Sequence, residues 1–174
     1  MLEVQSTLLG LAEVAIALAG FSAIVVIFKR GRDGKWSVKD ADQFHGVVVH
    51  AVFAVGFCFF PSVINLLVQD VSTSLHIACA VFGTQIVLHA GGVLLVKFPG
   101  LLVVISLVLG LIIGLVQFTV FTDWGVNREL EIYVVGIIWH AMQAGLLFVL
   151  LIWIAREDID VESTADSRPS DGQP

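Results

Sequence analysis

Five long runs of apolar residues, separated by short polar segments, dominate the hydropathy pattern of this chain. About 20 apolar residues are enough to cross a bilayer as a helix. The pattern therefore predicts an all-α fold, an integral membrane bundle of five transmembrane helices. The predicted helices cover residues 4–28, 43–68, 75–96, 101–122 and 131–155. They form one transmembrane domain, residues 1–156, followed by a disordered acidic tail, residues 157–174.

The basic residues predict how the bundle is oriented. Five of them, at 29, 30, 32, 35 and 39, directly follow the first apolar run. Since Lys and Arg mark loops that stay in the cytoplasm, the N-terminus is expected outside and the C-terminus inside. Five crossings then place eight basic residues on the cytoplasmic side and only Arg128 outside.

Composition supports a membrane protein and argues against several kinds of site. The chain is 57% hydrophobic and 14% charged, far from the roughly 25% charged residues of soluble domains. Most of the net charge of −6 comes from the C-terminal tail, so no nucleic-acid-binding surface is indicated. Cys58 and Cys79 lie within apolar runs and predict neither a disulfide framework nor a metal pair.

Glu13 is the most conspicuous polar residue within the apolar runs. An ionisable residue inside a membrane helix is expensive and marks a candidate functional site. By depth, its expected partners are His140, Gln143 and Asn65. Two interpretations stay open: a proton or ion site, or a hydrogen bond that only specifies helix packing.

A second polar group is predicted nearer the cytoplasmic side, on the second and third helices. Residues three or four apart share a helix face, which pairs Asp42 with His45 and Gln85 with His89. Because the two helices are antiparallel neighbours, His50 and His89 are expected to meet. These side chains are interpreted as interfacial or packing groups, with ligand binding as the alternative.

Small residues and aromatic residues predict how the helices pack. Small side chains let helix backbones approach closely in a membrane. In the first helix they occur on two sides, and in the fourth helix they recur at every fourth position. Tyr133 and Trp153 are expected at the two membrane interfaces, as an aromatic belt. The predicted helix-packing residues are Ala15, Ala19, Gly20, Ser106, Gly110 and Gly114.

Motifs for enzymatic chemistry are missing from the sequence, which contains no H-E-x-x-H, no G-x-S-x-G and no Walker motif. A non-enzymatic protein without a cofactor or metal is predicted. Haem-mediated electron transfer is the third-ranked alternative, because His76 and His89 lie about 20 Å apart along one helix. Their separation of thirteen residues turns the two rings away from one another, which argues against that alternative.

The segment Leu11-Ala12-Glu13-Val14 resembles the first helix of the small multidrug resistance transporters. In that family a membrane glutamate exchanges protons for cationic drugs, but the proteins have four helices rather than five. More broadly, Ala15 to Phe21 with the basic loop and Trp36 is similar to a pattern in small bacterial polytopic membrane proteins to which no function is assigned. This second resemblance implies a bacterial inner membrane.

Two functions follow as hypotheses. The first is a homo-oligomeric channel or a proton- or ion-linked transport unit that uses Glu13. The second is a structural or accessory subunit of a membrane complex, in which the polar residues specify packing.

Overall fold

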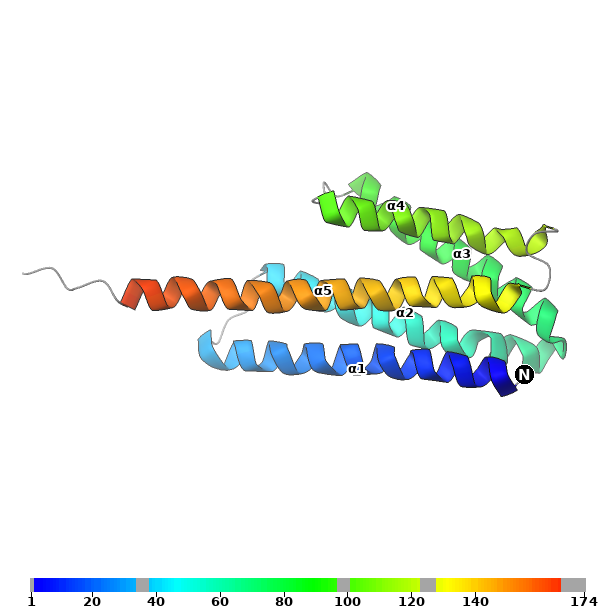
Figure 1. Cartoon of the computed structure of the whole chain (residues 1–174), viewed down its shortest axis with the longest axis horizontal. Helices are drawn as coiled ribbons and strands as arrows, with labels where there is room; N and C mark the ends of the chain where they lie inside the picture. The colour runs from blue at the N-terminus through cyan, green and yellow to red at the C-terminus, as the bar shows by residue number, and fades with distance from the viewer. Residues whose placement is uncertain (1, 34–37, 97–100, 123–127, 167–174) are drawn as a thin grey trace, which may run out of the picture.

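The computed structural model describes residues 2–33, 38–96, 101–122 and 128–166. In these residues the five predicted helices are all present, together with one short 3-10 segment (Figure 1). Three parts of the predictions lie outside the described residues: Trp36 in the predicted basic loop, the cytoplasmic Lys97, and the tail beyond Asp166. The elements are α1 Leu2–Asp33, α2 Val38–Val68, α3 Val71–Val96, α4 Leu101–Val116, η1 Gln117–Phe121 and α5 Glu129–Asp166.

Each of the five helices is long and apolar enough to cross a membrane. The candidate spans are Gln5–Ile27, Ala41–Val68, Val71–Leu95, Val103–Phe121 and Glu129–Trp153. An α-helix satisfies its own backbone polar groups, which is what a bilayer requires of any segment that crosses it. The class of protein is therefore a small polytopic membrane protein, as the apolar runs predicted.

Two helices extend well beyond their predicted ends. α1 continues to Asp33, through the beginning of the predicted basic loop, and α5 continues to Asp166, into the segment that was expected to be disordered. Extending an existing helix adds one hydrogen bond for each residue that is fixed, whereas starting a new one is costly. Polar residues can therefore prolong a membrane helix although they would not form one alone.

α5 is the centre of the bundle, because it contacts each of the other four helices. α1 packs against α2 and α5, whereas α4 packs against α3 and α5 on the other side (Figure 1). In the described part of the chain α1 touches neither α3 nor α4. One face of α1 is therefore buried in the bundle and the opposite face is left at its edge.

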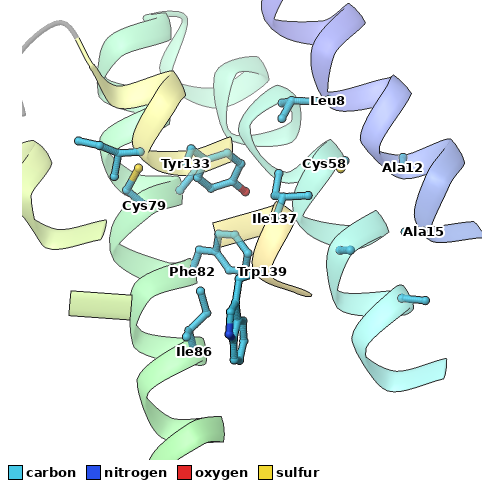
Figure 2. Close-up of a cluster of buried hydrophobic side chains, with 14 of the residues drawn as sticks. Leu8, Ala12, Ala15, Cys58, Cys79, Phe82, Ile86, Tyr133, Ile137 and Trp139 are labelled. Carbon is cyan, nitrogen blue, oxygen red and sulfur yellow. The ribbon is translucent and has the colours of Figure 1, made fainter. Parts of the chain in front are cut away.

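The core gathers large rings from α3 and α5 against small residues from α1 and α2 (Figure 2). Phe82, Tyr133 and Trp139 are almost completely buried, and the Tyr133 hydroxyl donates to the Phe57 carbonyl oxygen at 2.7 Å. Tyr133 is thus a core residue, and its predicted place in an aromatic belt is wrong. A buried hydroxyl needs a hydrogen-bond partner, and the carbonyl of α2 supplies it.

The stripe of small residues on α4 brings this helix onto α3 and α5, as predicted. A Cβ atom on Gly110 would overlap the indole ring of Trp139, and one on Gly114 would lie 2.8 Å from Val87 Cγ2. Ser106 on the same face accepts a hydrogen bond at its carbonyl oxygen from Trp139 Nε1, at 3.4 Å. The stripe therefore makes contacts within the fold.

Candidate functional site

The first candidate site is a group of polar side chains in the middle of the bundle, which we call the histidine core. His50 comes from α2, Gln85 and His89 come from α3, and His140 comes from α5. His140 is completely buried and His50 is 7% exposed. Three helices therefore place their polar groups at one point, where His50 and His140 are buried and Gln85 and His89 are half-buried.

Direct contacts join the members of the histidine core. His50 Nδ1 lies 2.9 Å from His140 Nδ1, and His140 Nε2 lies 3.0 Å from Gln85 Oε1. The rings of His50 and His89 meet edge to face, with centroids 4.9 Å apart. The predicted meeting of His50 and His89 is confirmed.

The hydrogen bonds fix which nitrogens carry protons when both imidazoles of the pair are neutral. Gln85 Oε1 can only accept, so His140 donates from Nε2 and keeps a lone pair on Nδ1. His50 must then donate from its own Nδ1, which leaves His50 Nε2 as an acceptor. This assignment follows from the orientation of the Gln85 amide. The pair can take up a proton at His50 Nε2, but it also satisfies itself without one.

Aromatic rings enclose the histidine core. The His140 ring is stacked between Phe53, at a centroid distance of 5.7 Å, and Phe82, at 5.5 Å. Trp139 packs at 4.8 Å from the same imidazole. Buried polar groups that are fully paired and tightly enclosed give rigidity to a core. The geometry suits a packing element at least as well as a conduit.

The other predicted site residues, from both groups, do not join the histidine core. Asp42 and His45 are exposed near the start of α2, while Gln143 is buried and donates from Nε2 to the Ser106 hydroxyl. Asn65 lies at the other end of α2, where its Oδ1 is 3.4 Å from the Ser74 hydroxyl. The histidine core therefore combines His140, from the group predicted around Glu13, with His50, Gln85 and His89 of the predicted inner group.

Glu13 is exposed on the outward face of α1. His140 and Gln143 are buried on α5, where they bond to α2, α3 and α4. The predicted pairing of Glu13 with these groups, and with Asn65, is therefore not found within the chain. The reason is the rotation of α1, which turns Ala12 and Ala15 into the core and Glu13 away from it.

The face around Glu13 is the second candidate site, which we call the α1 seam. Its positions alternate by four and three residues along the helix, the spacing of a seam between two packed helices. All six are exposed, and a Cβ atom at either glycine would have no atom of the chain within 4 Å. The α1 seam consists of Ser6, Gly10, Glu13, Ala17, Gly20 and Ile24.

Of the predicted packing residues of α1, two are confirmed in the fold and one is not. Ala15 is completely buried and Ala19 packs against the core, whereas Gly20 belongs to the exposed α1 seam. Other exposed faces of the bundle present large apolar side chains, such as Leu88 and Leu95 on α3. The α1 seam differs from them in being small and in carrying a carboxyl group.

Sequence reasoning missed a polar contact at the end of the bundle where α3 and α5 begin. Ser72 donates to Glu129 Oε1 at 2.9 Å. The two nitrogens of His76 lie 2.8 Å from the Ser72 carbonyl oxygen and 3.0 Å from that of Val120. These contacts tie α3 to η1 and α5. The polar residues before the predicted third helix were the available signal. Their partners could not be read from it, because Val120 is 44 residues from His76 and Glu129 is 57 residues from Ser72.

The geometry gives no support to a metal or haem site. In the described residues, no group of three or more His, Cys, Asp or Glu is placed to hold a metal ion. The rings of His50 and His89 touch, which leaves no space for a flat macrocycle between them. Both nitrogens of His76 face backbone oxygens. These histidines do not fit haem ligation.

No protein-family model, no curated protein and no solved structure matches this chain. The likeness of Leu11–Val14 to the small multidrug resistance transporters therefore rests on that segment alone.

Proposed function

We propose that this protein is a non-enzymatic accessory subunit that assembles with another membrane protein through the α1 seam. The observation that carries this proposal is the exposure of Glu13 well inside a predicted span, eight residues after its start at Gln5. An acidic side chain at the centre of a membrane helix costs roughly 2.5–3.5 kcal/mol on insertion scales, and such groups almost always face protein or water. A partner helix that offers a hydrogen bond to Glu13 removes this cost.

The small residues beside Glu13 supply the second half of the argument. Gly10, Ala17 and Gly20 leave a shallow surface on which a second helix backbone can approach closely. Close approach strengthens both dispersion and interhelical hydrogen bonds, the forces that drive association in lipid. The partner expected here is a membrane helix with its own hydrogen-bonding group at the depth of Glu13.

Two glycine substitutions test the proposal. Gly20 lies in the α1 seam and Gly92 lies on an exposed part of α3, and a Cβ atom at either would meet no atom within 4 Å. Native electrophoresis of membranes extracted in mild detergent should show the wild type and Gly92→Leu in a complex larger than one chain. Gly20→Leu should run at the size of the single chain. A wild type that already migrates alone, or a Gly20→Leu complex of unchanged size, contradicts the proposal.

A second function, proton-linked transport, is favoured by the contact between His50 Nδ1 and His140 Nδ1. Two histidines joined in this way can accept a proton at one end and release another at the other. Proton flux into liposomes that contain the purified protein tests this function. His140→Phe should abolish the flux while Glu13→Gln leaves it unchanged; wild-type liposomes no leakier than empty ones argue for the accessory subunit.

The proposed location is the inner membrane of a bacterium, with the N-terminus outside. The support is the charge asymmetry, because Lys29, Arg30 and Arg32 lie in the last turns of α1, while Arg128 lies at the opposite end of the bundle. Labelling of a cysteine placed at Gly34 should succeed only after the cytoplasmic side is opened. Labelling from outside intact cells contradicts this orientation.

A further inference from the structure

The Gln85 amide decides the order of the hydrogen bonds in the histidine core. Its Oε1 lies 3.0 Å from His140 Nε2, and the Nδ1 atoms of His140 and His50 are 2.9 Å apart. A neutral imidazole has one N–H and one bare nitrogen, whereas an amide has an oxygen that only accepts and an NH₂ group that only donates. Whichever end of the amide faces His140 therefore fixes the tautomers of both rings.

Two orders of hydrogen bonds fit these distances, and they differ at His50 Nε2. With the amide oxygen toward His140, as in the structure, each ring donates in the direction of Gln85 and His50 Nε2 is bare. With the NH₂ group toward His140, every bond is reversed and His50 Nε2 carries a proton. The surroundings of this one nitrogen therefore discriminate between the two orders.

The position of His50 favours the order with a bare Nε2. In the described residues His50 Nε2 has no hydrogen-bond partner, although the side chain is only 7% exposed. The rings of His89 and Trp139 pack against it edge to face. Buried N–H groups without an acceptor are rarer in proteins than buried acceptors without a donor. The environment of His50 thus supports, independently of the Gln85 oxygen, the same order of bonds.

We infer that Gln85 is the positioning residue of the histidine core: its amide oxygen holds His140 as the Nε2–H tautomer and thereby makes His50 Nε2 the atom at which the core accepts a proton. This inference rests on the second proposed function, proton-linked transport, and names the residue that gives the transfer its direction. Gln85 itself gains and loses no proton.

The order of bonds sets the order of proton transfer. A proton that binds His50 Nε2 forms an N–H bond there, and the N–H bond at His50 Nδ1 breaks as its proton passes to His140 Nδ1, 2.9 Å away. His140 then releases its Nε2 proton to a water molecule, because an amide oxygen is too weak a base to keep it. One proton has entered and one has left. Both rings are now in the other tautomer, and a half-turn of the Gln85 amide presents its NH₂ group to the bare His140 Nε2.

Nitrogen NMR of the purified full-length protein, labelled at histidine with a heavy nitrogen isotope, tests the inference. Protonated and bare ring nitrogens resonate in separate ranges, and the signals are assigned by their loss in His50→Phe and His140→Phe. We expect protons on His50 Nδ1 and His140 Nε2, with a coupling between the two Nδ1 atoms across their hydrogen bond. A proton on His140 Nδ1, or equal amounts of both tautomers, overturns the inference.

Two methionine substitutions separate positioning from packing. Methionine is unbranched and about as long as glutamine, but it has no amide. In Gln85→Met the protonated fraction of His140 Nε2 should fall from nearly all molecules toward about half, since either order then leaves one N–H without an acceptor. Gln143 is also buried and bonds to the Ser106 hydroxyl, one turn further along α5. Gln143→Met should therefore keep the wild-type tautomers, and an equal change in both variants contradicts the inference.

The outcomes separate this inference from proton transport itself. If the tautomers follow the expected pattern but wild-type liposomes are no leakier than empty ones, transport fails and the ordering of the core by Gln85 stands. If protons cross the membrane but Gln85→Met leaves the tautomers unchanged, transport stands and the role of Gln85 is ruled out.

Discussion

The histidine core and the α1 seam both place ionisable side chains within predicted membrane spans, yet their surroundings are opposite. Every polar nitrogen of His140 has a partner within the chain, and the ring is completely buried. Glu13 is exposed among glycines and alanine at the edge of the bundle. A polar group that the fold satisfies stabilises a single copy, whereas a carboxyl that the fold leaves exposed within a predicted span supports the proposed assembly. On the proposed function, the first site therefore contributes to the stability of one copy and the second to association with a partner.

The largest expected effect separates a glycine of the core from a glycine of the α1 seam. Gly110→Leu should lower the stability of the single copy strongly, at or above the upper end of the ~1–3 kcal/mol typical of overpacking, because the new side chain must displace the Trp139 ring. Gly20→Leu should leave that stability almost unchanged, since the site is open. Thermal unfolding of the purified monomer in detergent measures both. If the two variants lost equal stability, the α1 seam would be packed within one copy as the core is, and the comparison would fail.

The next effect concerns His140. His140→Leu removes the acceptor of His50 and the donor to Gln85, which leaves two polar groups without partners. We expect a loss of about 1 kcal/mol, between the ~0.6 average for membrane hydrogen bonds and the ~1–3 for orphaned buried groups. His45→Leu, on the exposed start of α2, is the control and should change little.

A double substitution sharpens the same measurement. When both partners of a hydrogen bond become apolar, no polar group of that bond is left unpaired. His50→Leu combined with His140→Leu should therefore cost less than the sum of the two single variants. A strictly additive result would mean that the contact between the two imidazoles contributes nothing to stability.

A smaller effect is expected at Glu13 itself. In the isolated monomer, Glu13→Leu should change the free energy of unfolding by no more than about 0.5 kcal/mol, as is usual for exposed positions. The same substitution is expected to weaken the complex formed through the α1 seam, so the two readouts should differ. A large loss of monomer stability would show that Glu13 supports its own bundle, and the contrast with the histidine core would fail.

The smallest effect lies outside both regions, at the turn between α2 and α3. Hydrogen bonds from the Thr73 side chain and from the Thr73 backbone N–H, at 2.8 Å, hold the pKa of Asp70 below its ordinary value of 3.8. A carboxylate with a lowered pKa stabilises the fold above its ordinary pKa, and this contribution is lost as the pH falls through the lowered value. The difference in unfolding temperature between the wild type and Asp70→Ala should therefore be constant from pH 7 to about pH 4 and shrink below it.

Asp70→Asn is the control for that pH dependence. Its side-chain oxygen can still accept from the Thr73 N–H at the start of α3, and asparagine caps helices as well as aspartate does. It should therefore resemble the wild type at neutral pH without the fall in acid. If Asp70→Ala shows the same difference at every pH, the charge of Asp70 has no part in capping α3.

Much of the bundle was predictable, because hydropathy alone is enough to locate membrane helices in a sequence. All five helices were expected, and so was the meeting of His50 and His89, since two antiparallel neighbours bring residues of equal depth together. The α4 stripe predicted a close contact, although its partner, Trp139, was not foreseen. The indole comes from a helix that is distant in the sequence.

The failed pairing of Glu13 with His140 has a different origin. The first helix carries small residues on two sides, and either side could have packed into the bundle. Only the structure shows that the side with Ala12 and Ala15 is buried, which turns Glu13 outward. Tyr133 was misplaced for a related reason, because its depth suited an interface while its direction brought it into the core.

The sequence by itself determined that five stretches of this chain suit lipid, the position of each polar residue along its helix, and the connecting segments in which positive charge collects. These properties depend on composition and on the constant rise of a helix, which are local. The tertiary structure alone decided the rotation of each helix about its axis, and hence that His140 meets His50 and Gln85 while Glu13 faces away from them. Rotation depends on side-chain fit between helices that are far apart in the sequence, and that fit is not encoded in any one of them.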